Sequence, residues 1–242
     1  MNKIWIIAKR ELNSFFDSLM AYIMIVIFLL FSGFLTWIYG NNDVFFIGQA
    51  SMQSFFGVAY WTLFFFIPAL TMRLVAEERR TGTLEMVLTK PITDWQFIVG
   101  KYLATLILIL IAIFLTLPYY FTIWSLGKID HGAVWSGYLG LILMSSAYIS
   151  IGLVSSAYTN NQIIAFLISL FIGIFFHLIF GLISNAFPGI LGKIFDFLNL
   201  GTHFESISRG VIDTKDIIYF LSITFLGLFI SETALAKRNI VS

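Results

Sequence analysis

Residues 102–126 read YLATLILILIAIFLTLPYYFTIWSL and contain no charged side chain. A helix needs about 20 consecutive apolar residues to cross the hydrocarbon core of a bilayer. In lipid, backbone N–H and C=O groups find partners only within a helix or a closed barrel. This stretch therefore predicts a transmembrane helix, and the rest of the chain can be interpreted outward from it.

The composition extends this interpretation to the whole chain of 242 residues. Hydrophobic residues make up 59% and charged residues 11%, whereas soluble domains average about 45–50% and about 25%. A folded chain of this size still exposes a large surface, so much of its apolar area has to face lipid. The composition excludes one or two ordinary soluble domains.

Charged residues gather between stretches of bilayer length. We expect six membrane-spanning helices, at about 19–39, 55–75, 102–126, 134–157, 162–183 and 217–236. The last uncharged run, Ile217–Ser231, is short, so Glu232 should lie near an interface or pair with Lys237 or Arg238. The predicted fold class is an all-α integral membrane protein with one transmembrane domain over residues 1–242.

The distribution of Lys and Arg predicts the orientation, because cytoplasmic loops of membrane proteins are enriched in both. With the N-terminus in the cytoplasm, only four of the 14 basic residues fall on the outer side: Lys128, Lys193, Arg209 and Lys215. Both termini are therefore expected in the cytoplasm.

An amphipathic helix is expected before the first span. Ile4, Ala8, Leu12, Phe15 and Leu19 recur at helical spacing, and the charged side chains fall away from this stripe. Such a helix lies in the plane of the membrane interface. The alternative is a basic segment that only fixes the orientation.

The motifs of soluble catalysis are absent from the sequence. Gly-Lys occurs at 100–101, 127–128 and 192–193, but no Ser or Thr follows and the upstream Gly is missing, so there is no phosphate-binding loop. The chain has no Cys, no His-Glu-x-x-His and no Gly-x-Ser-x-Gly. We expect no catalytic residue, metal or cofactor in this chain. The net charge of +1 argues against nucleic acid as a partner.

His177 stands nearly alone as an ionisable side chain inside the predicted spans. One interpretation is a helix–helix hydrogen bond, worth roughly 0.6 kcal/mol on average. The other is a group on a substrate or proton path. An intramembrane enzyme or a proton-driven carrier needs more such groups, so the sequence disfavours both classes.

The connection between the second and third spans, 73–101, reads RLVAEERRTGTLEMVLTKPITDWQFIVGK. A charged segment, 77–80, extends the exit of the second span. Gly82 can then take the left-handed conformation that ends a helix. Thr93 and Gln96 form a capping-box pattern that starts the next helix.

Between these signals, Leu84, Val87 and Leu88 give a short helix with an apolar face, beside Met86. The connection is therefore expected as two short helices and a capped return into the membrane, suited to docking on a soluble partner. The alternative is a solvated loop whose charges only fix the topology.

The run AEERRTGTLEMVLTKPITDWQFIVGKYLA, 76–104, follows a span that ends FFIPALTMR, 65–73. Together these resemble the permeases of ABC-2 type transporters, which carry an acidic AEE-type stretch, a Gly-Thr-Leu-Glu element, a Pro and a Gly-Lys-x-x-Ala entry into the third span. The resemblance covers the whole chain.

The resemblance implies that the chain is a permease of the bacterial inner membrane. Such permeases pair with a second copy or with a related permease or accessory membrane subunit. Two copies of a separate ABC ATP-binding subunit bind the ATP. The coupling helix that docks there maps to about Ala76–Lys90. The residues implied in this coupling are Glu77, Glu78, Arg79, Arg80, Gly82, Thr83, Leu84, Glu85 and Leu88.

The resemblance also implies a re-entrant outer loop before the sixth span. Ile190, Leu191, Ile194, Phe195 and Leu198 have helical spacing, with Lys193 and Asp196 on the other side. An amphipathic hairpin and a loop packed on the end of the bundle are both compatible with this pattern.

Residues 203–229, HFESISRGVIDTKDIIYFLSITFLGLF, resemble a narrower branch, and the overall sequence is most similar to the permease of the gliding-motility ABC transporter. A rival hypothesis is a structural component that anchors a motility or assembly complex and transports nothing. The sequence does not identify a transported substrate.

Overall fold

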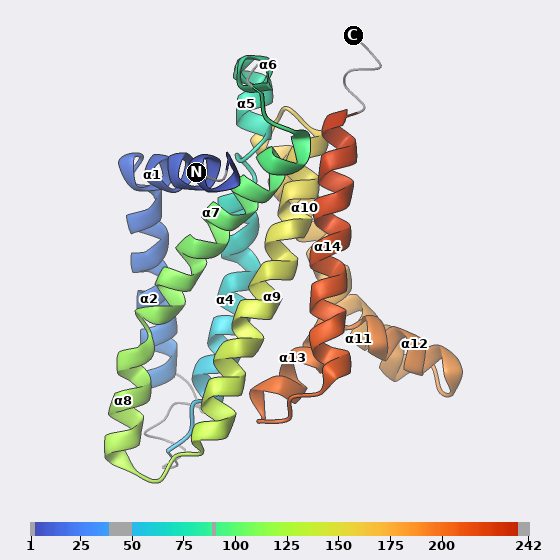
Figure 1. The fold of residues 1–242 in the computed structure, drawn as a ribbon. Helices are drawn as coiled ribbons and strands as arrows, with labels where there is room; N and C mark the ends of the chain where they lie inside the picture. Colours follow the sequence, from blue (N-terminus) through green and yellow to red (C-terminus); the bar gives the residue numbers. More distant parts are fainter. Residues whose placement is uncertain (1–2, 39–49, 89–90, 237–242) are drawn as a thin grey trace.

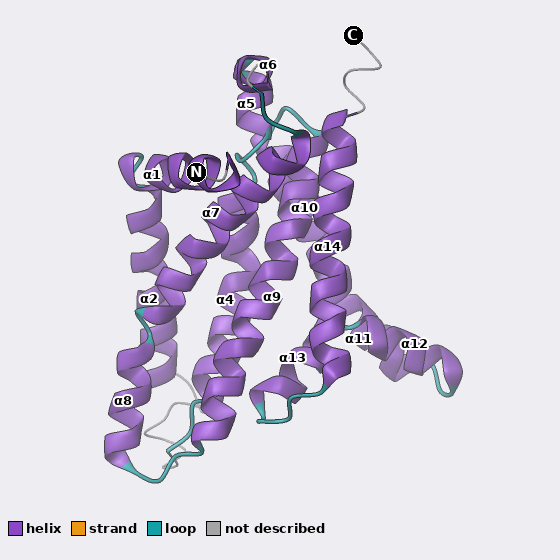
Figure 2. Ribbon diagram, in the orientation of Figure 1, coloured by secondary structure: helices purple, strands orange, loops and turns teal. Residues whose placement is uncertain are grey.

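The computed structural model describes residues 3–38, 50–88 and 91–236, and these form helices and connecting turns without a strand among them (Figure 2). Six helical segments are long and apolar enough to cross a membrane. They cover Met20–Trp37, Gln53–Arg80, Asp94–Leu126, His131–Tyr158, Gln162–Ala186 and Thr214–Ala236. The predicted all-helical class with six spans is confirmed for this part of the chain.

The central helix of the bundle is α9 (His131–Tyr158). Around it pack α4 (Gln53–Thr71), α7 (Asp94–Phe114), α10 (Gln162–Ile174) and α14 (Thr214–Ala236). Polar side chains join α9 to α14: Ser146 Oγ lies 2.9 Å from Thr224 Oγ1, and Ser150 Oγ donates to the Ile223 carbonyl at 3.3 Å. Such contacts hold helices together where burial of apolar area does not.

The outer surface of the bundle exposes many large apolar side chains. On α2 (Met20–Trp37), α10 and α14, large apolar side chains such as Leu30, Ile163 and Phe225 are exposed. A helix that is apolar all round belongs in a core or in a membrane. These faces therefore fit contact with lipid.

The third predicted span begins earlier than expected and is broken. α7 starts at Asp94, where Thr93 and Gln96 form the predicted capping box. It ends at Phe114, and α8 (Leu117–Leu126) follows after Leu115 and Thr116. Pro118 lacks an N–H, and its ring would clash with the carbonyl four residues earlier. The helix is broken at Pro118, whereas α4 continues through Pro68.

The fifth span continues from α10 through one π-helical turn, η1 (Phe175–Ile179), into α11 (Phe180–Ala186). The next helix, α12 (Ile190–Leu198), coincides with the predicted amphipathic helix, and α13 (Leu200–Ser208) leads to α14. α11 and α12 form a hairpin that projects sideways from the bundle (Figure 1). Its entry into the membrane remains a prediction.

One end of the bundle carries the elements that the sequence singled out. α1 (Lys3–Asp17) lies across this end, and α5 (Ala76–Arg80) and α6 (Thr83–Leu88) stand beyond it (Figure 1). Leu19, expected on the apolar stripe of α1, is instead exposed in the turn to α2, in the left-handed region with φ 58°. We call this end the α1 end and the opposite one the α8 end.

Candidate functional site

The candidate site is the α5–α6 arm, residues 76–88, together with the helices that hold it. Gly82 forms its corner in the predicted left-handed conformation, with φ 70°. Thr81 Oγ1 donates to the Glu77 carbonyl at 2.9 Å and lies 2.9 Å from Thr83 Oγ1. These bonds close the turn between the two short helices, so the angle of the arm is fixed.

Ser156 of α9 ties the root of the arm to the core. Its Oγ accepts hydrogen bonds from the backbone N–H groups of Val75 and Ala76, both at 3.0 Å, and donates to the Met72 carbonyl at 3.1 Å. The first N–H groups of a helix lack intrahelical partners. The central helix therefore supplies the missing acceptor to the start of α5.

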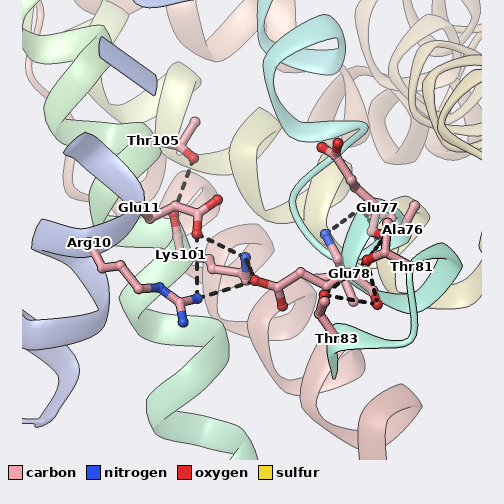
Figure 3. A network of polar contacts seen from close by, with 11 residues as sticks. Arg10, Glu11, Ala76, Glu77, Glu78, Thr81, Thr83, Lys101 and Thr105 are labelled. Carbon is pink, nitrogen blue, oxygen red and sulfur yellow. Dashed lines mark hydrogen bonds and ion pairs between the residues drawn. The ribbon is translucent and has the colours of Figure 1, made fainter. Parts of the chain in front are cut away.

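A buried lysine joins the arm to two further helices (Figure 3). Lys101 of α7 is only 1% exposed, and its Nζ lies 3.0 Å from both Glu11 Oε2 of α1 and Glu78 Oε1 of α5. Arg10 of α1 donates to Glu78 Oε1 at 3.2 Å. The ring centroid of Phe97 lies 5.0 Å from Nζ, in cation–π range. A buried ammonium group needs such partners.

The burial of Lys101 follows from how closely α1 lies on α7. A Cβ at Gly100 would come within 2.6 Å of Cγ2 of Ile7, so only Gly allows this approach. At the C-terminal end of α1, Nη2 of Arg73 lies 3.2 Å from Ser18 Oγ, and its guanidinium carbon lies 5.1 Å from the Phe15 ring centroid. α1 is thus fastened to both α7 and the exit of α4.

Residues 42–235, well over half of the chain, match the family model described as ABC-2 family transporter protein. The chain belongs to this family. As an ABC-2 protein it is a multi-pass membrane component of an ABC transporter, as the sequence resemblance indicated. The match supports the family and not the narrower gliding-motility branch. No curated protein matches the chain.

The expected coupling residues of this ABC-2 protein occupy different positions on the arm. Arg80, Thr83 and Glu85 are exposed, and Glu77 and Arg79 are half-buried. Leu84 is buried within the chain, so it holds α6 to the bundle and offers no open apolar surface. The Leu88 side chain and Lys90 lie outside the described residues.

The structure brings Glu78 together with Arg10, Glu11 and Lys101, which sequence analysis did not place in the site. A signal was present: the capping box starts α7 at Asp94, which puts Lys101 two turns inside a helix that enters the membrane. A lysine at that depth needs a partner. The pattern of charges alone assigns Lys101 to the connection 73–101.

His177 is buried, and its Nδ1 lies 2.7 Å from the Tyr148 hydroxyl of α9. Its ring stacks on those of Tyr60 and Phe64, with centroids 4.0 and 4.4 Å away. The helix–helix hydrogen bond of the first interpretation is therefore present. A role on a transport path remains a hypothesis.

A second ionisable pair, which sequence analysis missed, lies toward the α8 end. His203 Nδ1 of α13 is 2.6 Å from Asp216 Oδ1 of α14, and both side chains are buried. His203 Nε2 lies 2.8 Å from the Phe197 carbonyl. The pair fastens α12 and α13 to the last span. Among the described residues, no cluster of three or more metal-ligating side chains occurs.

Asp213, just before α14, is half-buried. Lys215 donates to its carboxylate from the backbone N–H at 3.1 Å, and the Lys215 ammonium lies 3.2 Å away. These backbone and side-chain bonds lower the pKa of Asp213 below its usual value. As the pH falls, the Asp213 carboxylate therefore stays ionised further than a free aspartate would.

Proposed function

We propose that this chain is the permease subunit of an ATP-driven transporter, and that the α5–α6 arm docks on a separate ABC ATP-binding subunit. One observation carries the proposal: the arm extends beyond the α1 end of the bundle and is fastened to three helices (Figures 1 and 3). Ser156 joins it to α9, Lys101 to α7, and Arg10 to α1.

These attachments define how a movement of the arm would reach the spans. Glu78 accepts from cations on α7 and α1 at once, so a displacement of α5 pulls on both helices. The bonds of Ser156 transfer the same displacement to the central helix. Hydrogen bonds between charged groups are stronger than neutral ones, so the contacts of Glu78 can transmit a movement of α5 to α7 and α1.

The surface of the arm fits a protein partner. Arg80 and Glu85 expose charges of opposite sign, which can set the register of an interface and speed encounter. ATP binding and hydrolysis belong to the partner, and this chain supplies the path. By the family resemblance, two permease chains, or this chain and a related membrane subunit, assemble with two ATP-binding subunits.

The orientation follows from the charges. The α1 end carries α1, the arm and the C-terminal end of α14 (Figure 1), and it holds most of the basic residues assigned to the cytoplasm. We place this end in the cytoplasm of a bacterial cell, with the chain in the inner membrane. A link to gliding motility is the finer proposal, and it rests on the sequence resemblance alone, that of residues 203–229 and of the chain as a whole.

The test is co-purification of the native ATP-binding subunit, with ATP hydrolysis measured in reconstituted vesicles. Arg80→Glu combined with Glu85→Lys should abolish both binding and transport-linked hydrolysis. The matched control Glu205→Lys with Arg209→Glu exchanges the charges of an exposed pair on α13, away from the arm, and should leave both intact. Unchanged binding in the arm variant would refute the proposal. A stable complex without transport of any substrate would favour the anchoring role.

A further inference from the structure

A groove opens on the side of the bundle, where the break between α7 and α8 leaves space against α9. Its volume is about 510 Å³, within the range of about 300–1,000 Å³ typical of small-molecule sites. The walls come from two stretches of chain: Ile107, Ile111 and Phe114 of α7, and Trp135, Tyr138 and Ile142 of α9.

The groove is apolar even though it lies at a helix break. The break frees backbone carbonyls, which would ordinarily need water or a polar ligand. Those of Ile113 and Thr116 accept from the Thr116 and Tyr119 N–H groups at 3.0 and 2.9 Å, and Thr116 Oγ1 and the Tyr138 hydroxyl donate to them as well, at 2.6 and 3.3 Å. The Tyr138 hydroxyl is thus paired and most of the lining side chains are apolar, so the groove offers few groups to a polar ligand or to a water molecule, which needs two to four partners.

The position of the groove along the bundle follows from helix geometry. α8 has 10 residues, or about 15 Å at a rise of about 1.5 Å per residue. The hydrocarbon core is about 30 Å thick, so the break lies near its middle. The groove therefore spans the middle of the core: Ile107 and Ile111 lie on the α1 side of the break, and Trp135, near the start of α9, lies toward the α8 end.

An aromatic cluster, Tyr120, Trp124 and His131, stands between the groove and the α8 end. Tyr120 hydroxyl lies 2.8 Å from His131 Nδ1, and the Trp124 ring stacks on Tyr120 with centroids 6.1 Å apart. The ring centroid of Trp135, in the groove wall, lies 5.9 Å from that of Tyr120. Such amphipathic rings occur at the level of lipid headgroups. They mark where the groove meets the membrane surface.

We propose that this groove binds one acyl chain of a membrane phospholipid, with the headgroup beside the aromatic cluster. The wall on α9 runs from Trp135 to Ile142, about 10 Å of helix, which matches part of a single chain. The rim is continuous with the lipid-facing surface, because Phe114, Leu115 and Trp135 are exposed. Hydrocarbon in the groove makes the dispersion contacts that an empty space forfeits, and it bridges α7 and α9 across the break.

The experiment uses the full chain in vesicles that contain phosphatidylethanolamine with a photoactivatable diazirine in one acyl chain. Labelled residues are mapped by mass spectrometry. Tyr138 and Ile113 are each only 4% exposed, so an acyl chain reaches them only from within the groove. Labelling at both is expected. Labelling confined to exposed residues such as Phe114 would overturn the proposal.

A filling variant and a matched control complete the test. Ile142→Trp occupies the groove and should lower labelling at Tyr138 roughly tenfold, the change that about 1.4 kcal/mol of binding produces. Ile163→Trp, on the exposed face of α10, should leave it unchanged. Ile107→Phe is the second filling variant if Ile142→Trp unfolds. Equal labelling in filling and control variants contradicts the proposal.

A second copy of the chain is the competing occupant. The chain has no Cys, so Ile142→Cys provides a single thiol in the groove. Oxidation should give no disulfide between two chains if lipid fills the groove. A disulfide-linked dimer would assign the groove to a chain–chain interface and overturn the proposal.

Discussion

Lys101→Met removes the cation at the centre of the arm's attachment while keeping a side chain of similar length. At 3.0 Å and an effective dielectric constant of about 20, each carboxylate contact contributes roughly 5 kcal/mol before desolvation. Removing one partner of a buried pair costs about 3–5 kcal/mol net. Glu11 and Glu78 are 13% and 18% exposed, and Arg10 still contacts Glu78. We therefore expect the low end, about 3 kcal/mol.

The assay is thermal unfolding of the purified protein in detergent. For chains of this length, 1 kcal/mol shifts the midpoint by about 2–4 °C, so Lys101→Met should unfold roughly 6–12 °C below the wild type. The triple variant Lys101→Met, Glu11→Gln, Glu78→Gln leaves no buried charge uncompensated. It should recover most of this loss, because neutral replacement of a buried ion network is often tolerated.

The triple variant also separates stability from function. Its arm is attached to α7 without ionised bonds, so ATP hydrolysis by the bound partner should become less dependent on transport. A Lys101→Met midpoint equal to that of the wild type would refute the pairing of Lys101. If ATP hydrolysis in the triple variant depended on transport as in the wild type, the ion pairs of Lys101 would only stabilise the fold.

Three further changes test other contacts that hold the helices in place. Gly82→Ala places a side chain at φ 70°, which should lower the free energy of unfolding by about 1–2 kcal/mol and weaken co-purification of the ATP-binding subunit. The control Gly57→Ala lies in a helix with open space around the added methyl group and should leave co-purification unchanged. Ser156→Ala leaves two backbone N–H groups without their acceptor and should lower the unfolding midpoint by an amount equivalent to about 1–3 kcal/mol per group; Ser155→Ala, which loses only an intrahelical bond, should change it little. His203→Phe strands the buried Asp216 and should cost about 3–5 kcal/mol in the same unfolding assay; adding Asp216→Asn should restore most of it, and a failure to do so would contradict the pairing.

The parts of the fold that depend on local signals could be predicted from the sequence. The number of spans follows from the spacing of charges. The corner at Gly82, the capping box of Thr93 and Gln96, and the helix Ile190–Leu198 each depend on residues a few positions apart. Their physical causes are a backbone preference, a local hydrogen bond and a helical period, all of which a single sequence displays.

Contacts between distant residues could not be predicted in this way. Lys101 meets Glu11 and Glu78 because Gly100 lets α1 lie on α7. The local sequence indicates that Lys101 needs a partner, but not which residues provide it. The orientation of Leu84 depends on the bundle that it packs against. Glu232 is half-buried near the end of α14, while Lys237 and Arg238, its expected partners, lie outside the described residues.

The central claim is that the α5–α6 arm contacts the ATP-binding subunit. Because the chain has no Cys, Glu85→Cys places a single thiol on the exposed face of α6, and Asp130→Cys places one at the α8 end. A heterobifunctional cross-linker that joins the thiol to partner lysines should link Glu85→Cys to the ATP-binding subunit, with a yield that changes on addition of ATP, and should leave Asp130→Cys unlinked. No product from Glu85→Cys in a complex that still hydrolyses ATP, or an equal product from Asp130→Cys, would contradict the account.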